Sequence, residues 1–125
     1  MRRHPLSTTR LYKSFGYALK GIAELLMSQA NARIHLLAII VVSIAGFYYR
    51  INAEEWRSVV FAFAIVLAAE GFNTAIEYLT DLVSPEHHPL AGKTKDVAAG
   101  AVLICAIGAV LIGGIIFLPK IFAHI

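Results

Sequence analysis

The chain has 125 residues, is 58% hydrophobic and has a mean hydropathy of +0.71. This composition excludes an ordinary soluble domain, because a chain of this length encloses only a small core and a bilayer must cover the remaining apolar surface. The net charge is only +3, and the single cysteine, Cys105, excludes an internal disulfide. We therefore expect an all-α membrane protein.

The first predicted element is an amphipathic helix over residues 8–31. Its apolar residues recur at intervals of three and four, which gives one apolar face. The opposite face carries Arg10, Lys13, Tyr17, Lys20 and Glu24. A basic amphipathic helix beside a membrane span usually lies in the plane of the interface, so we interpret this one as a surface anchor. The alternative is that Arg10, Lys13 and Tyr17 also face a ligand phosphate or base.

Three apolar runs follow, and each predicts a transmembrane helix, over about residues 34–50, 59–80 and 97–118. A span needs about 20 apolar residues, so the first run is marginal and the other two are sufficient. We expect Pro119 to end the third helix. We expect no cleavable signal peptide, because the first apolar run begins behind the amphipathic stretch.

The second run carries polar residues that the bilayer disfavours. A carboxylate at the depth of Glu70 costs several kcal/mol unless it is paired, protonated or facing a wet cleft. Asn73, Glu77 and Asp81 follow at spacings that place them on the same helical face. This polar stripe predicts a chemical site at a membrane surface.

The segment Ser84–Asp96 is predicted to be a non-helical loop, because it contains two prolines and Gly92. Gly92-Lys93-Thr94 resembles the end of a P-loop, but the position of the upstream glycine is His87 and no strand precedes it. Adjacent histidines diverge, so we interpret His87 and His88 as solvated rather than metal-binding. Asp96 fits the N-terminal end of the third span, where simple capping also explains it.

The third run is rich in small residues, which let neighbouring helices approach closely in lipid. They are Ala98, Ala99, Gly100, Ala101, Gly108, Gly113 and Gly114. Three helices do not easily enclose a polar stripe, so we expect subunits to cover or share the face of Glu70. Packing within one chain is the alternative use of these residues.

The positions of the basic residues predict the orientation. Eight of them lie before the first span or between the second and third, while only Arg50, Arg57 and Lys120 lie on the other side. The eight are Arg2, Arg3, Arg10, Lys13, Lys20, Arg33, Lys93 and Lys95. The positive-inside rule then places the N-terminus and the loop Ser84–Asp96 in the cytoplasm.

Two motifs in these elements resemble the prokaryotic integral-membrane diacylglycerol kinase family. The first is E-x-x-N-x-x-x-E, within Ala69–Glu77, and the second is K-D-x-A-x-G-A-V, from Lys95 to Val102. The segments Phe15–Gly21 and Arg33-Ile34-His35 are similar to the same family. Arg33-Ile34-His35 and His88-Pro89-Leu90 are closer to its undecaprenol kinase branch. The resemblance covers essentially the whole chain from Arg10 onward.

The resemblance implies a homotrimer of three-span subunits with shared active sites. It implies transfer of the γ-phosphate of ATP to a lipid hydroxyl, with Glu70 as the general base and Asn73 orienting the reacting groups. Glu77 is then the Mg²⁺ ligand at the ATP phosphates, and Ala99 joins Glu70 on the lipid side. The implied nucleotide pocket consists of Arg10, Tyr17, Glu77, Glu86, His88, Lys95 and Asp96. Phosphoryl transfer depends mainly on positioning and charge neutralisation, which suits this set.

Gln29 departs from the family pattern. The position usually supplies a second acidic metal ligand from the amphipathic helix, whereas Gln29 offers only an uncharged carbonyl oxygen. Glu24 does not simply replace it, because five residues rotate a side chain by about 140° around a helix. Either Glu77 and the phosphates suffice, or metal binding and activity are weakened.

We interpret the chain as a single membrane kinase domain, residues 1–125, of a bacterial cytoplasmic membrane. Its expected partners are ATP, Mg²⁺, a membrane lipid alcohol and further copies of itself, with no nucleic acid. Undecaprenol is the preferred acceptor and diacylglycerol the alternative. A hypothesis of another class is a non-enzymatic membrane subunit or a small transporter that binds protons or ions at Glu70. Glu86, Lys95 and Asp96 argue against it, because a proton carrier does not need them.

Overall fold

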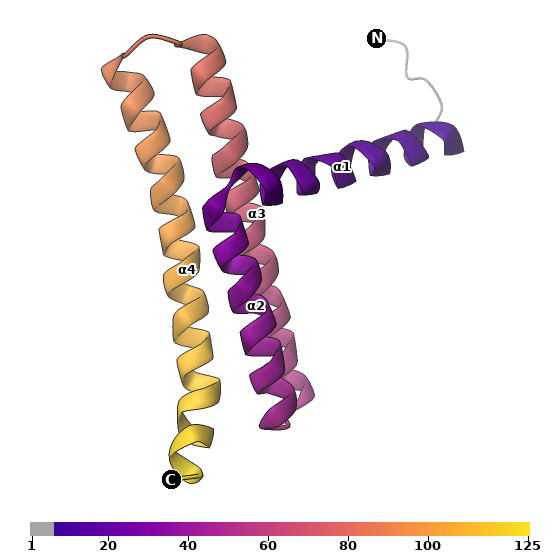
Figure 1. Cartoon of the computed structure of the whole chain (residues 1–125), viewed down its shortest axis with the longest axis vertical. Helices are drawn as coiled ribbons and strands as arrows, with labels where there is room; N and C mark the ends of the chain where they lie inside the picture. Colours follow the sequence, from indigo (N-terminus) through magenta and orange to yellow (C-terminus); the bar gives the residue numbers. More distant parts are fainter. Residues whose placement is uncertain (1–6) are drawn as a thin grey trace.

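The computed structural model describes residues 7–125, and this part of the chain forms four α-helices. They are α1 (Thr8–Ser28), α2 (Ala30–Tyr48), α3 (Ala53–Val83) and α4 (Pro89–Ala123). In Figure 1, α2, α3 and α4 run along one bundle axis and α1 projects sideways from it. The prediction of an all-α chain is confirmed. Arg2 and Arg3, which contribute to the predicted orientation, lie outside the described residues.

The junction between α1 and α2 lies at Gln29, whose backbone is extended (φ −112°, ψ 114°). The predicted helix over residues 8–31 therefore ends three residues early, and residues 30 and 31 belong to α2. The last carbonyls of a helix need partners from outside it. Arg33 provides them: its Nη1 donates to the carbonyls of Leu26 and Met27, at 3.4 and 2.9 Å. A side chain of α2 thus caps two of the last carbonyls of α1, and the backbone N–H of Gln29 donates to that of Leu25.

Helix α3 is longer than the predicted span of residues 59–80, because it begins with a strong cap. The side chain of Asn52 accepts from the backbone N–H of Glu55, and the Glu55 carboxylate accepts from the N–H of Asn52. This reciprocal capping box satisfies two amide groups at the helix start. The preceding turn passes through Arg50 at φ 52°, in the left-handed region. The 31 residues of α3 carry the polar stripe as one continuous helix.

Helix α4 contradicts three predictions. Residues 89–96 are helical, so the non-helical loop is limited to residues 84–88, and Lys95 and Asp96 lie in the second turn rather than at the helix end. Pro89 takes the first helical position, where its missing N–H costs nothing, and His88 Nδ1 accepts from the N–H of Leu90 at 3.1 Å. Pro119 does not end the helix, which continues to Ala123. Proline is tolerated inside membrane helices.

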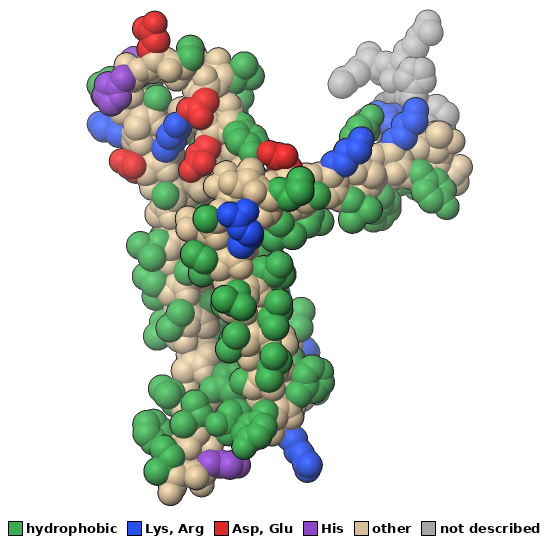
Figure 2. Space-filling model, viewed as in Figure 1, with side chains coloured by type: hydrophobic (Ala, Val, Ile, Leu, Met, Phe, Trp, Pro, Cys, Tyr) green, Lys and Arg blue, Asp and Glu red, His purple; other side chains and the backbone are tan. Residues whose placement is uncertain are grey.

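The buried core is small and lies at the end of the bundle remote from α1. Ile51, Val59, Ile116 and Phe117 form it, and Trp56 is among the residues that pack around it. Elsewhere most large apolar side chains are exposed, and α2, α3 and α4 are each long and apolar enough to cross a membrane. Figure 2 shows the apolar side chains along the length of the bundle. Most acidic side chains lie around the α3–α4 loop and α1. The chain is a multi-pass membrane protein.

Candidate active site

Glu70 is the most deeply buried large side chain of the described residues, with an exposed fraction of 2%. It lies in the middle of α3, and its Oε1 is 3.2 Å from Nε2 of His35 in α2. Its position inside an apolar run predicted that Glu70 is paired, is protonated or faces a water-filled cleft. The structure pairs it, with an imidazole that crosses the α2–α3 interface.

Asn73 and Glu77 extend the site by one and two turns along α3. Asn73 Nδ2 donates to Glu77 Oε1 at 3.4 Å, so the structure brings these two predicted site residues together. The Oδ1 of Asn73 and the Oγ1 of Thr74 are buried and have no hydrogen-bond partner among residues 7–125. Buried polar atoms are usually satisfied, so these two oxygens mark a place where a ligand atom or water is needed. Thr74 was not predicted from the sequence.

Asp81 ends the polar stripe with a contact to α4. Lys95 Nζ lies 2.6 Å from Asp81 Oδ1, and both side chains are partly exposed. Because α3 is helical throughout, Glu70, Asn73, Glu77 and Asp81 lie along one side of it, as predicted. Glu77 is seven positions after Glu70, which is roughly 10 Å along the helix axis. The stripe therefore runs from a buried carboxylate to a solvated ion pair.

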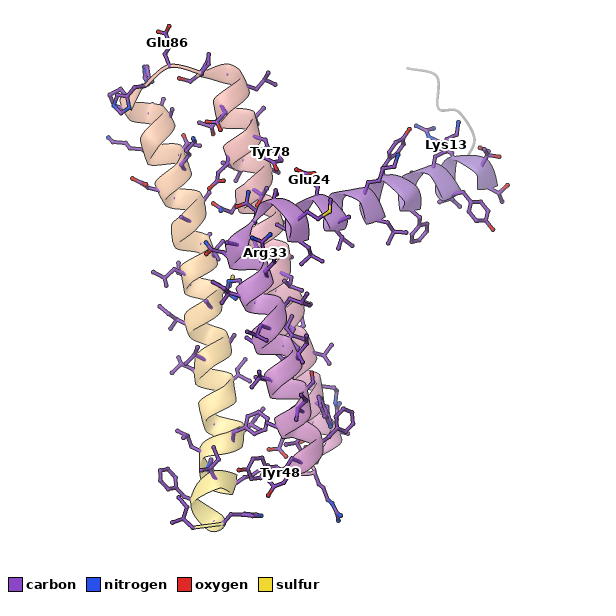
Figure 3. The ribbon with its side chains drawn as sticks, in the orientation of Figure 1. Lys13, Glu24, Arg33, Tyr48, Tyr78 and Glu86 are labelled. Atoms are coloured by element: carbon purple, nitrogen blue, oxygen red, sulfur yellow. The ribbon has the colours of Figure 1, made fainter. Side chains whose placement is uncertain are left out.

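The predicted nucleotide residues lie in two separate parts of the chain. Lys95 and Asp96 lie in α4, next to the loop that carries Glu86 and His88. The side chain of Lys95 is half-buried, and those of the other three residues are exposed. Figure 3 shows Glu86 at the α3–α4 loop and Lys13 near the free end of α1. Glu77 lies in α3, and the other two, Arg10 and Tyr17, are exposed on α1, which projects from the bundle. One chain does not bring the two groups together.

Gln29 is half-buried at the α1–α2 junction and makes no side-chain capping bond. It was predicted to lie on the amphipathic helix itself, which is wrong, because α1 ends one residue earlier. Glu24 has another contact: Tyr78 donates its hydroxyl to Glu24 Oε1 at 2.8 Å and lies 3.2 Å from Ser28 Oγ. Figure 3 shows Glu24 and Tyr78 where α1 crosses α3. This contact attaches α1 to α3.

The donor set of this region fits Mg²⁺ held together with phosphates. Residues 7–125 contain no group of three or more His, Cys, Asp or Glu side chains that could hold a metal ion alone. Mg²⁺ is usually bound by one or two carboxylates plus substrate phosphates and water, not by an all-protein cage. The Glu77 carboxylate beside the unpartnered Oδ1 of Asn73 offers the hard oxygen donors that this ion prefers.

The remaining predicted residue, Ala99, is exposed on α4, next to the buried Ala98. Sequence reasoning missed the role of His35 as the partner of Glu70, although the same argument from lipid depth applies to it. An ionisable side chain inside an apolar run is disfavoured unless it faces a partner. On α2 this signal points to His35, whereas its pairing with Glu70 depends on how the two helices pack.

The sequence comparisons identify the family of this chain. A profile of the prokaryotic diacylglycerol kinase family matches residues 16–117. The chain is 39% identical over 118 residues to an undecaprenol kinase of Bacillus subtilis, covering 94% of this chain and 96% of that protein. It is 37% identical to a diacylglycerol kinase of Synechocystis, covering 90% and 65%. For the diacylglycerol kinase of Escherichia coli K12 the identity is 29%, covering 89% and 91%. The chain belongs to the prokaryotic diacylglycerol kinase family.

Proposed function

We propose that this lipid kinase transfers the γ-phosphate of ATP to the hydroxyl of undecaprenol. The observation that carries the choice of acceptor is the 39% identity to an undecaprenol kinase over nearly the full length of both proteins. The diacylglycerol kinases named above match at lower identity. Diacylglycerol is therefore the alternative acceptor.

In the proposed reaction Glu70 is the general base. Its carboxylate accepts the proton of the lipid hydroxyl while the lipid oxygen bonds to the γ-phosphorus and ADP leaves. Glu70 is buried at 2% exposure in a helix that crosses the membrane, which is where a lipid hydroxyl arrives. Positioned general bases contribute about 10²–10⁴ in rate. Asn73, one turn away, orients the reacting groups, and Ala99 lies on the lipid side.

The nucleotide binds near the solvated end of the stripe. Lys95, Asp96, Glu86 and His88 hold it from the α3–α4 end of one subunit, and the α1 residues Arg10 and Tyr17 complete the pocket. Glu77 holds Mg²⁺ together with the ATP phosphates, and Gln29 is a weaker candidate ligand. When bound, the ion neutralises charge on the phosphates.

We propose a homotrimer in which α1 of one subunit completes the nucleotide pocket of another. The support is geometric: Arg10 and Tyr17 lie on a helix that projects from the bundle, away from Lys95 and Asp96 (Figure 1). The exposed small residues of α4, including Ala99 and Ala101, allow close approach of a neighbouring helix in lipid.

We also propose that α1 lies in the membrane interface and that the whole chain, residues 1–125, acts as one kinase domain of a bacterial cytoplasmic membrane. The N-terminus and the α3–α4 loop then face the cytoplasm, where ATP is available. The eight-to-three distribution of basic residues supports this orientation.

A competition assay tests the acceptor. Purified protein in mixed micelles receives undecaprenol and diacylglycerol at equal mole fraction, with ATP and Mg²⁺, and the two phosphorylated lipids are separated and counted. We expect undecaprenyl phosphate to be the main product. Phosphatidic acid as the main product would make diacylglycerol the acceptor, and no phosphorylated lipid from either alcohol would refute the proposed function.

A further inference from the structure

We propose that His35 is a positioning residue for the catalytic base: its Nε2–H donates a hydrogen bond to Glu70 Oε1 and holds that carboxylate for proton transfer. This inference rests on the proposed function, in which Glu70 accepts the proton of the lipid hydroxyl. No part of the nucleotide pocket or of the metal site described above involves His35.

The contact is specific to this pair. Glu70 makes one side-chain hydrogen bond among residues 7–125, between its Oε1 and Nε2 of His35, at 3.2 Å. His35 comes from α2 and Glu70 from α3, so the bond links α2 to the buried end of the stripe along α3. Glu70 has an exposed fraction of 2%, whereas that of His35 is 23%. A buried carboxylate is stabilised by such a donor and is otherwise strongly disfavoured.

The donor groups of Arg33 and Asn73 bond to other acceptors, and the Thr74 hydroxyl makes no hydrogen bond within residues 7–125. Arg33, two residues before His35, directs its guanidinium to the carbonyls of Leu26 and Met27 at the end of α1. The Asn73 amide donates to Glu77 rather than to Glu70. The imidazole is thus the one basic group among the described residues that engages the buried carboxylate.

The bond has a definite chemical consequence. With the proton on Nε2, His35 is a donor and occupies Oε1, and the second oxygen of the carboxylate stays available for the lipid proton. A base whose orientation is fixed by a third group is a recurring arrangement in enzymes that activate a hydroxyl. Loss of the donor leaves the base in place but lets its carboxylate rotate, so the rate falls while substrate binding does not.

Two isofunctional amides at position 35 test this role, because they differ only in reach. The side-chain amide of Gln extends about as far as Nε2 of histidine, whereas that of Asn does not. We expect His35→Gln to keep most of the kcat and His35→Asn to lose about 10- to 100-fold, the value of one hydrogen bond to a charged group. The KM for Mg-ATP should stay within about twofold of wild type in both, since the nucleotide residues are untouched.

The matched control is His124→Asn, at the far end of α4, where the imidazole contacts Tyr49. Its kcat should equal that of wild type. Each variant is first checked for the elution volume and thermal midpoint of wild type in detergent. If His35→Asn does not fold, His35→Leu, which suits an apolar surrounding, takes its place with the same expected loss.

The two possible failures are distinguishable. A wild-type protein that phosphorylates no lipid alcohol refutes the proposed function. An active wild type with equal kcat in His35→Gln and His35→Asn overturns the positioning role, whether both retain activity or both lose it. Loss confined to the KM for Mg-ATP also overturns it, because that result assigns His35 to nucleotide binding.

Discussion

At the residue scale, Glu70 combines two properties that a lipid-directed base requires. It lies in the middle of a helix long and apolar enough to cross the membrane, and it is paired with His35, which lowers the cost of burying the carboxylate. Glu77, seven residues nearer the solvated end, is linked to Asn73 instead. In the proposed mechanism the stripe separates the proton acceptor, Glu70, from the metal ligand, Glu77, along one helix.

The substitution Glu70→Gln tests the first of these functions. It keeps the size of the side chain and removes its basicity, so turnover of the lipid should fall by about 10²–10⁴. Binding of Mg-ATP should be nearly unchanged, since the nucleotide residues lie elsewhere. Steady-state kinetics and equilibrium ATP binding on the same preparation measure both quantities. A kcat near that of wild type would remove Glu70 from the role of base.

Gln29→Glu tests whether the α1–α2 junction faces the metal site. A carboxylate there should lower the Mg²⁺ concentration needed for half-maximal activity, because hard divalent cations gain most from charged oxygens. Titration of Mg²⁺ against lipid phosphorylation compares the two forms. An unchanged midpoint together with an unchanged rate would show that Gln29 lies away from the ion.

At the element scale, the close approach of α2 and α3 depends on Gly46. A Cβ atom at this position would lie 2.6 Å from Cη2 and 2.8 Å from Cζ2 of Trp56. The Trp56 ring also packs against Phe47, with ring centroids 5.0 Å apart, so it has little freedom to shift. The glycine is therefore required for packing, not for its backbone conformation, since its φ is not positive.

We expect Gly46→Ala to lower the free energy of unfolding by about 1–3 kcal/mol, the usual cost of overpacking. Gly16→Ala is the matched control, because a Cβ there meets nothing within 4 Å. Thermal unfolding in the same detergent measures both. Equal midpoints for the two variants would mean that the contact of Gly46 with Trp56 relaxes without cost.

The helices and the polar stripe were predictable because lipid imposes simple rules. Apolar runs gave the three spans, and the cost of a buried carboxylate singled out Glu70. The helix ends were not predictable from proline alone: Pro89 begins a helix and Pro119 lies inside one. The pairing of His35 with Glu70 joins residues 35 apart, and the junction at Gln29 depends on a side chain of the next helix. Such contacts depend on how the helices pack, which no local pattern encodes.

At the scale of the whole molecule, α1 is the helix that packs against the rest of the chain over only part of its length. It is attached near its end, through Glu24 and Tyr78, and the rest of it projects from the bundle (Figure 1). The interfacial position proposed for α1 gives its apolar face a partner in the bilayer and brings Arg10 within reach of a neighbouring subunit. Both proposals require α1 and the α3–α4 loop to lie on the same side of the membrane.

Labelling of single cysteines tests this orientation in a Cys105→Ala background. His87→Cys, in the α3–α4 loop, should react with an impermeant reagent only after the cells are opened. Glu54→Cys, at the opposite end of α3, should react in intact cells. The reason is the excess of Lys and Arg on the side of the α3–α4 loop. Labelling of His87→Cys from outside intact cells would reverse the orientation.

Transfer of the terminal phosphate of ATP to a lipid alcohol is measured with radiolabelled ATP. Purified protein in mixed micelles with undecaprenol as the sole acceptor receives ATP labelled either at the γ- or at the α-phosphate. We expect a labelled lipid product from γ-labelled ATP and none from α-labelled ATP, with Mg²⁺ required in the assay. No labelled lipid from γ-labelled ATP in any tested alcohol, or equal labelling from both forms, would contradict the proposed transfer.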